Sequence, residues 1–332
     1  MYIIAEIAQA HDGSVGIAHS YIDALASTGV NAVKFQTHIA HAESSSFEPF
    51  RVKFSYEDDT RFDYWQRMEF TPDQWAGLKL HCEEKGLEFI SSPFSCAAVD
   101  LLENLKVKKY KIGSGEVNNL LMLEKIAHTG KDIILSSGMS SLTELDTTID
   151  FLKSFGNKLS VLQCTTAYPT IAGEWGLAVI PLLRQRYQLP TGFSDHSGDI
   201  FACLAATTLG AEILEFHAVF DKSMFGPDAK ASLTISQVKK LVEGVRDITI
   251  DLETGSGKES SERYSGLKKI FEKSLAVNKD LEEGHILAFD DLEAKKPSGH
   301  GIAAKDFQSE IGKRLLQKKS AWDFLQNNDL SE

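Results

Sequence analysis

The chain has 332 residues, of which 42% are hydrophobic and 25% are charged, as expected for one large domain with a small appendage. Lys and Arg number 35 against 47 Asp and Glu, and the net charge of -12 argues against nucleic acid or an anionic membrane as the main partner. The four cysteines form no CxxC pair, and neither a basic leader nor an apolar run of the roughly 20 residues that a membrane span needs is found. We therefore expect a cytoplasmic protein with reduced thiols.

Short β-rich runs alternate with amphipathic helical patterns over the first 250 residues. The first helix is predicted from Ser14 to Gly29, and a later one buries Val238, Leu241 and Val245 on one face. Eight strands are predicted, at 2–7, 31–36, 87–92, 108–113, 132–137, 159–164, 191–196 and 212–217. This alternation predicts a (β/α)8 TIM barrel. A doubly wound open sheet is the alternative, although no GxGxxG follows the first strand, which disfavours a dinucleotide-binding fold.

Two regions interrupt or follow the barrel pattern. The insertion at 38–71 carries Arg51, Lys53, Arg61 and Arg67 among aromatic residues, and we interpret it either as a lid over the strand tips or as an excursion without a role. The polar, glycine-rich composition of residues 255–266 is typical of a linker. We expect the barrel to cover 1–258, the linker 259–273, and a small β-rich domain 274–332. Some 60 residues are too few for a robust core, so this domain should pack on another surface, such as a partner subunit.

Alternate residues of a barrel strand face the interior and the surrounding helices. This alternation predicts that the following residues face the interior: Glu6, Lys34, Gln36, Lys111, Ser194, His196, Glu215 and His217. A buried lysine is costly unless an anion pairs with it, so two of them predict a multiply charged anionic ligand. Internal bridges from the lysines to Glu6, Glu116 and Glu215 are the alternative.

Hydroxyl side chains follow three of the predicted strands. KIGSGE (111–116) places glycines around Ser114, where backbone amides can approach a phosphate. SSPFS (91–95) and LSSGMS (135–140) add Ser92 and Ser136. Together with the lysines they predict an oxyanion cage, although serine and glycine also simply end strands.

Two histidines end neighbouring strands, His196 in GFSDH and His217 in EILEFH. Imidazoles from adjacent strand tips of a barrel can share one divalent ion and leave positions open for substrate and water. The alternative is that both are ordinary polar residues at strand ends.

Eight motifs together resemble a known family. They are IAEIAQAHDGS, NAVKFQTH, KIGSGE, ILSSGM, CTTAYPT, GFSDH, EFHAVFDK and GPDAKASL. In this order and spacing they resemble the sialic acid synthase family of phosphoenolpyruvate-condensing enzymes, and the tail from about Ser274 resembles its small antifreeze-like (SAF) domain. The resemblance implies that phosphoenolpyruvate condenses with N-acetylmannosamine, or a related N-acetylated hexosamine, to give a nine-carbon 2-keto sugar acid and phosphate.

The resemblance also implies roles for individual residues. His196 and His217 would hold a divalent metal, Mn2+ or alternatively Mg2+ or Co2+, with Glu6 and Glu116 as further catalytic groups. The phosphoenolpyruvate ligands would be Lys34, Ser92, Lys111, Ser114, Ser136, Thr166 and Ser194. The sugar would meet Gln36, Tyr168, Asp228 and Lys296. A domain-swapped homodimer would carry Lys296 to the partner's sugar site, although the family pattern more often has arginine before this proline. Ala10-His11 likewise replaces the usual Asn-His pair.

Other functions stay open at this point. GPD at 226–228 is closer to sialic and legionaminic acid synthases than to the pseudaminic branch, so a 2,4-diacetamido-trideoxyhexose is an alternative acceptor. A Schiff-base aldolase or lyase using Lys111 is an alternative of another class. A non-catalytic carbohydrate-binding barrel is the third, although inward lysines are costly to keep without chemistry.

Overall fold

A computed structural model of the chain describes residues 1–52, 54, 56–255, 257–258 and 260–331. Its internal contacts divide it into two compact units, Met1–Thr254 and the chain from Gly255 onward. No helix in these described ranges combines the length and apolarity that a membrane crossing requires.

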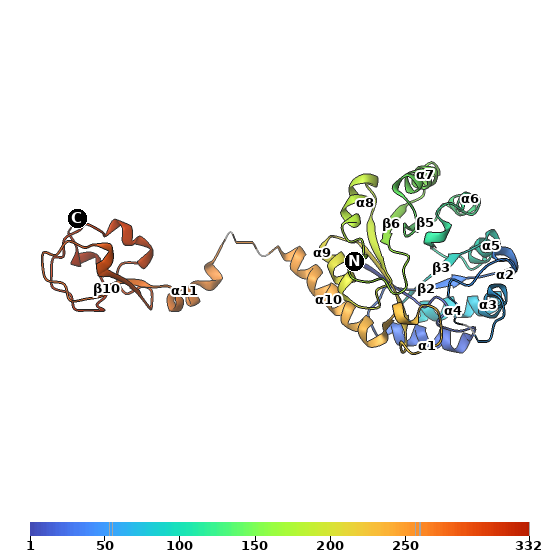
Figure 1. The fold of residues 1–332 in the computed structure, drawn as a ribbon, viewed down its shortest axis with the longest axis horizontal. Coiled ribbons are helices and arrows are strands. Elements are labelled where there is room, and N and C mark those ends of the chain that lie inside the picture. The colour runs from blue at the N-terminus through green and yellow to red at the C-terminus, as the bar shows by residue number, and fades with distance from the viewer. Residues whose placement is uncertain (53, 55, 256, 259, 332) are drawn as a thin grey trace. The chain divides into compact units, whose positions relative to one another are not determined.

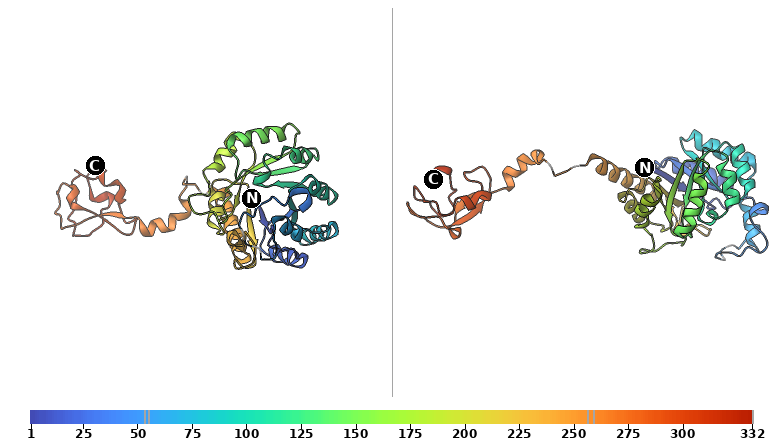
Figure 2. Two further views of the ribbon diagram at one scale, coloured as in Figure 1. Left: turned by 45° about the vertical axis from the view of Figure 1, so that its right-hand side comes forward. Right: turned by 90° about the horizontal axis from the view of Figure 1, so that it is seen from above.

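The first unit is a closed parallel barrel with helices around it (Figures 1 and 2), as predicted. Its strands are β1 (Tyr2–Glu6), β2 (Ala32–Thr37), β3 (Glu88–Pro93), β4 (Lys109–Ile112), β5 (Asp132–Ser136), β6 (Leu159–Cys164), β7 (Thr191–Asp195) and β8 (Ile213–Val219). Each strand pairs with the next, and β8 pairs back to β1, which excludes the open doubly wound sheet. A short β9 (Leu233–Thr234), absent from the sequence prediction, pairs in parallel with the carboxyl end of β8.

Local sequence signals set the helix ends. The helices are α1 (Val15–Ala26), α2 (Ala40–Glu43), α3 (Arg61–Met68), α4 (Pro72–Glu84), α5 (Cys96–Asn104), α6 (Leu120–Ala127), α7 (Leu142–Lys153), α8 (Val179–Tyr187), α9 (Phe201–Thr208), α10 (Ile235–Thr254) and α11 (Ser265–Phe271). Ser14 caps α1 by accepting a hydrogen bond from the Ile17 amide. Helix α1 ends at Ala26, three residues before the predicted Gly29, which takes the left-handed conformation that glycine favours.

Apolar side chains form two layers that confirm the predicted strand parity. Val33, Phe35, Tyr110 and their equivalents pack outward against the helices. Inside the barrel, one layer of apolar residues closes the lower end: Ile4, Ala32, Ile90, Ile134, Leu162 and Ile213. Two residues further along each of these strands the interior becomes polar, because the side chains of one strand face alternate sides. The apolar layer is therefore the floor of a polar site at the carboxyl ends of the strands.

The described residues of the insertion after β2 belong to the first unit. Helices α2 and α3 enclose a small apolar cluster of Ala40, Tyr64, Trp65 and Met68. Arg67 of α3 reaches the loop after β1 through an ion pair with Asp12 at 2.6 Å. Lys53, noted in the sequence as part of this insertion, lies outside the described residues. The insertion thus has its own core and a fixed attachment to the barrel.

The C-terminal unit has a separate small core. Strand β10 (Ser274–Val277) pairs antiparallel with β11 (Leu292–Lys295), and the apolar cluster beneath them includes Leu275 and Val277. The first unit ends at Thr254, whereas we expected the barrel to end at residue 258. The segment at 259–273, which we expected to be a linker, contains α11. This helix buries none of its side chains.

Candidate active site

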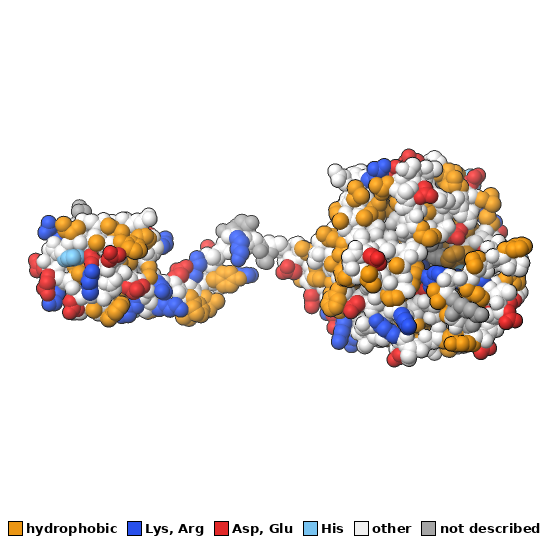
Figure 3. Space-filling model, in the orientation of Figure 1, with side chains coloured by type: hydrophobic (Ala, Val, Ile, Leu, Met, Phe, Trp, Pro, Cys, Tyr) orange, Lys and Arg blue, Asp and Glu red, His pale blue; other side chains and the backbone are white. Residues whose placement is uncertain are grey.

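A pocket of about 340 Å3 opens at the carboxyl ends of the strands, and Lys and Arg side chains are visible inside the hollow (Figure 3). Every site residue predicted within the barrel lines it: Glu6, Lys34, Gln36, Ser92, Lys111, Ser114, Glu116, Ser136, Thr166, Tyr168, Ser194, His196, His217 and Asp228. Lys296 belongs to the C-terminal unit, where its ammonium lies 5.0 Å from the centre of the Phe271 ring. The predicted residues on seven of the strands, and Thr166 and Tyr168 in the loop after β6, are therefore gathered in one cavity.

The deepest polar layer consists of two lysines and two carboxylates. Lys34 Nζ lies 2.6 Å from Glu6 and 3.7 Å from Glu215, and Lys111 Nζ lies 3.3 Å from Glu215. The internal bridges considered as an alternative thus form with Glu6 and Glu215. The expectation that Glu116 also takes part is wrong, because Glu116 instead accepts a hydrogen bond from Asn119 on the rim side. Glu215 Oε2 is buried without a hydrogen-bond partner among the described residues, so the bridges leave this layer incompletely satisfied.

Burial and mutual charge set the ionisation of this layer. Burial lowers the pKa of Lys111 even though Glu215 opposes the shift. Burial acts in the same direction on Lys34, but Glu215 and Glu6 outweigh it and raise the pKa of Lys34. Burial would raise the pKa of Glu6, yet Lys34 and His217 lower it well below its usual range. Lys34 and Glu6 are therefore both charged at neutral pH.

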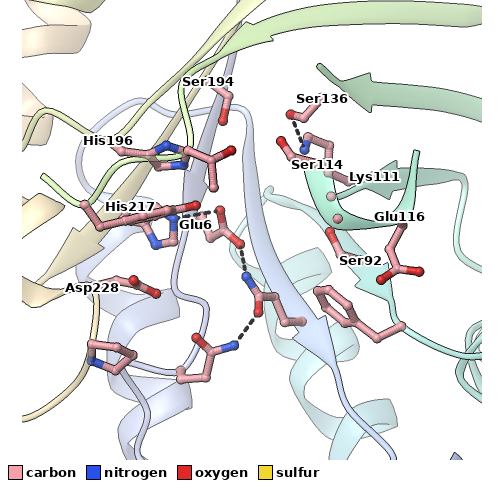
Figure 4. Close-up of a pocket in the computed structure, with 18 of the residues that line it drawn as sticks. Glu6, Ser92, Lys111, Ser114, Glu116, Ser136, Ser194, His196, His217 and Asp228 are labelled. Atoms are coloured by element: carbon pink, nitrogen blue, oxygen red, sulfur yellow. Dashed lines mark hydrogen bonds and ion pairs between the residues drawn. The ribbon is translucent and has the colours of Figure 1, made fainter. Parts of the chain in front are cut away.

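Hydroxyl groups lie beside the lysines, and Figure 4 shows Ser136 and Ser114 next to Lys111. Lys111 Nζ donates to Ser136 at 2.7 Å, and Lys34 Nζ lies 3.4 Å from Ser92. Ser114 lies on a 3-10 turn directly after β4. Gly138, which sequence reasoning did not single out, lies so close that an added Cβ would collide with the hydroxyls of Ser114 and Thr166. Ammonium and hydroxyl donors converging on one place form a site for a multiply charged anion.

The two imidazoles lie beside this anion site, with ring centres 5.3 Å apart. His196 Nδ1 is 2.9 Å from the Thr165 carbonyl oxygen, and His217 Nε2 is 3.3 Å from Glu6. Burial lowers the pKa of His217. Burial would also lower that of His196, but Cys164 and the Thr165 carbonyl outweigh it and raise the pKa to about 9.

The rings of His196 and His217 are the candidate metal-binding pair. The Thr165 carbonyl orients the His196 ring through Nδ1 and leaves Nε2 for a ligand, as in many protein metal sites. The described residues contain no group of three or more His, Cys, Asp or Glu side chains that could hold an ion. The chain thus offers two nitrogen ligands, and substrate and water would have to supply the others. Such an open donor set fits a catalytic metal better than a structural one.

The insertion forms the outer wall of the pocket. Arg51 Nη2 donates to Asp228 at 2.6 Å, and its guanidinium lies 4.2 Å from the centre of the Tyr168 ring. The Tyr168 ring in turn lies 4.2 Å from that of His196. Arg61 lies 3.5 Å from Glu48. Arg51 therefore contacts two of the residues predicted to face the sugar.

Sequence reasoning missed several pocket residues. Cys164 follows the inward Leu162 by two positions, so strand parity alone could have placed it inside. Gln9 and His38 lie beyond their strands, where alternation no longer applies. His11, whose role was left open, is buried outside the pocket lining, where its ring lies 4.6 Å from that of Phe70 and its Nδ1 accepts from the Gly13 amide. Burial lowers its pKa to about 3.

The fold and pocket define a (β/α)8 barrel with buried lysines and hydroxyl groups beside paired imidazoles. The sequence model of the NeuB family matches residues 21–257, and the chain belongs to this family. The N,N'-diacetyllegionaminic acid synthase of Campylobacter jejuni is 35% identical over 317 residues, covering 94% of this chain and 94% of that protein. The N-acetylneuraminate-9-phosphate synthase of Homo sapiens is 31% identical over 319 residues, which cover 95% of this chain and 88% of that protein. The sialic acid synthetase of Leptospira borgpetersenii, solved with citrate, superimposes with a TM-score of 0.70 at 28% identity over 80% of this chain and 89% of that chain.

Proposed function

We propose that this protein is an enzyme that condenses phosphoenolpyruvate with N-acetylmannosamine or a related N-acetylated hexosamine. The products are a nine-carbon 2-keto sugar acid of the N-acetylneuraminate type and phosphate. One observation carries the proposal: two buried lysines and several hydroxyls meet beside two imidazoles in a single pocket. Membership of the NeuB family and the names of the relatives support it.

The inner end of the pocket suits phosphoenolpyruvate. Its carboxylate and phosphate would take charge-assisted hydrogen bonds from the lysines and from the hydroxyls. The donors we assign are Lys34, Ser92, Lys111, Ser114, Ser136, Thr166 and Ser194. A bound anion would also add negative charge beside Lys111, which offsets the burial that lowers the pKa of its ammonium group.

The outer end suits the sugar. We assign Gln36, Tyr168 and Asp228 to sugar contacts, because these side chains line the pocket on the side walled by the insertion. In the reaction, C3 of phosphoenolpyruvate bonds to the aldehyde carbon, the aldehyde oxygen gains a proton, water adds to C2, and phosphate leaves with cleavage of its bond to C2. Burial raises the pKa of Glu116, as suits a proton donor, and makes it a better proton-transfer candidate than Glu6, whose pKa is held well below its usual range.

We propose His196 and His217 as ligands of a divalent ion, with Mn2+ first and Mg2+ or Co2+ as alternatives. When bound, the ion would supply Lewis acidity toward the sugar aldehyde.

A 2,4-diacetamido-trideoxyhexose is the second candidate acceptor. The relative at 35% identity is named for the legionaminic acid that this sugar would yield, and it matches over nearly the whole chain. Both sugars carry an aldehyde and an acetamido group, so the proposed chemistry is the same for each.

An activity panel tests the proposal. The purified protein is given phosphoenolpyruvate with N-acetylmannosamine, its 6-phosphate or the 2,4-diacetamido sugar, with Mn2+ or with a chelator, and phosphate release and product mass are recorded. We expect phosphate release that requires both an acceptor sugar and Mn2+. Chelator-insensitive turnover, with borohydride trapping pyruvate on Lys111, would instead support a Schiff-base enzyme.

A further inference from the structure

We propose that Gln9, His38 and Glu43 are positioning residues that hold the amide of Gln36 in one orientation, with its N–H groups directed at Glu6 and at the acceptor. This inference rests on the proposed function and deepens it, because it names the atoms with which Gln36 would recognise the sugar. The five residues form what we call the Glu43–Glu6 chain.

The Glu43–Glu6 chain is a continuous series of hydrogen bonds that joins α2, the loops after β1 and β2, and the ends of these two strands. Glu43 Oε1 lies 2.6 Å from His38 Nδ1, and Gln9 Nε2 lies 3.0 Å from His38 Nε2. Gln9 Nε2 also donates to Gln36 Oε1, and Gln36 Nε2 donates to Glu6 Oε1 at 2.7 Å. Figure 4 shows the carboxylate of Glu6 at its inner end, facing His217.

The Lys34 contact dictates which way the Gln36 amide points. Glu6 Oε1 accepts from Lys34 Nζ at 2.6 Å, so the Gln36 group that shares this oxygen must be Nε2, and Gln36 Oε1 must accept from Gln9. His38 Nε2 lies 3.0 Å from Gln9 Nε2 and 3.1 Å from Gln36 Oε1, and His38 Nδ1 can donate to Glu43. If the Gln36 amide were turned over, its oxygen would face the Glu6 oxygen and its nitrogen would face that of Gln9 inside the protein.

Packing fixes the same geometry. The His38 ring is stacked between Trp65 and Phe94, with ring centres 3.9 and 4.6 Å away and planes within 17°. Gln9 and His38 are both buried. Glu43 ends α2 and Trp65 belongs to α3, so the insertion supplies one hydrogen-bond partner and one stacking partner. The insertion thus supports a binding residue in addition to walling the pocket.

This arrangement leaves one hydrogen of Gln36 Nε2 for a ligand. The bond to Glu6 uses the other, and the described residues provide no second acceptor for it. Gln36 would therefore donate to an oxygen of the acceptor, such as an acetamido carbonyl or a hydroxyl, and would discriminate against a donor at that position.

Kinetics of four variants test the proposal. Gln9→Leu and Glu43→Leu break the chain without touching the pocket lysines, whereas Glu43→Gln keeps an oxygen that can accept from His38. We expect the two leucine variants to raise the KM for the acceptor by about ten-fold, the effect of one lost hydrogen bond, with the KM for phosphoenolpyruvate within about two-fold. Glu43→Gln should restore most of the acceptor affinity. The control is Glu69→Gln, which alters the carboxylate that binds the Ala40 amide of α2 outside the chain.

Equal changes in both KM values, or none, would overturn the proposal, and thermal melting of each variant separates misfolding from loss of positioning. A second measurement does not need turnover. In protein labelled with 15N-histidine, the His38 signals, identified by their absence in His38→Gln, should show a proton on Nδ1. An unprotonated Nδ1 would refute the hydrogen bond to Glu43, and with it the Glu43–Glu6 chain, even if the enzyme is active. Absence of turnover in the wild type with every acceptor would refute the proposed function alone.

Discussion

At the scale of single residues, the pocket is built around charges that stabilise the fold poorly. Lys34, Lys111, Glu6 and Glu215 are nearly fully buried, and one Glu215 oxygen has no partner in the described part of the chain. Buried ion pairs offset their desolvation cost only when every polar atom is satisfied. Such a layer is better explained by the anion that it would receive than by its contribution to folding.

His217 gives the most direct residue-scale prediction. His217→Ala should reduce turnover by roughly 1,000-fold, because the ion it would hold supplies several kcal/mol of transition-state stabilisation. The neighbouring side chains that anchor β8 in the outer core, Leu214 and Phe216, are unchanged, so the fold should persist. Phosphate release and circular dichroism measure the two effects. Near-normal activity would remove the metal from the mechanism.

Gly138 gives a prediction that depends on shape alone. A methyl group there would collide with the Ser114 and Thr166 hydroxyls, so Gly138→Ala should displace two donors of the anion site. We expect the KM for phosphoenolpyruvate to rise by at least about ten-fold, the effect of one charge-assisted hydrogen bond. The matched control is Gly77→Ala, which adds a methyl where nothing lies within 4 Å, and should leave that KM unchanged. Unaltered affinity in Gly138→Ala would mean that the anion binds elsewhere.

At the scale of elements, the insertion is attached to the barrel loops by a few polar contacts. Arg51 joins it to Asp228 and lies over Tyr168. The Arg51 side chain is 40% exposed, so its pair adds at most about 1 kcal/mol to stability. We therefore expect Arg51→Ala to leave the melting temperature within about 4 °C while the acceptor KM rises several-fold. A large fall in melting temperature with an unchanged KM would show that the contact is only structural.

The C-terminal unit offers a pH-dependent prediction. Burial would raise the pKa of Asp291, but Lys279, the Ala288 amide and His285 outweigh it and lower the pKa to about 2. A lowered carboxyl pKa stabilises the fold above its unfolded value near 4, and this contribution is lost as the pH falls toward about 2. Hydrogen exchange at 275–277 should accelerate over that interval, and less so in Asp291→Asn. If hydrogen exchange accelerated equally in the wild type and in Asp291→Asn as the pH falls, this assignment would be contradicted.

At the scale of the whole molecule, we propose a domain-swapped homodimer in which Lys296 reaches the sugar site of the other subunit. Lys296→Ala should then raise the KM for the acceptor and leave that for phosphoenolpyruvate unchanged. The control is Lys295→Ala, because Lys295 instead donates to the Trp322 carbonyl within its own unit. Sedimentation of the wild type should show a dimer. A rise in the phosphoenolpyruvate KM instead would mean that the roles are misassigned.

Much of the barrel could be predicted from the sequence, because strand periodicity is a local property. All eight strands were found, and alternation placed Lys34, Lys111 and Glu215 inside without any structure. Motif order was enough to name the family, which the family comparison then confirmed. These inferences need only neighbours in sequence and the two-residue period of a strand.

Which of these side chains contact one another depends on the closed barrel and not on the local sequence. The pairing of Lys34 with Glu6 and the approach of Gln9 to His38 join residues 28 and 29 positions apart. The wall that Arg51 forms with Asp228 joins residues 177 positions apart. No local pattern encodes such distances, because they depend on how strands and loops are brought together when β8 closes on β1.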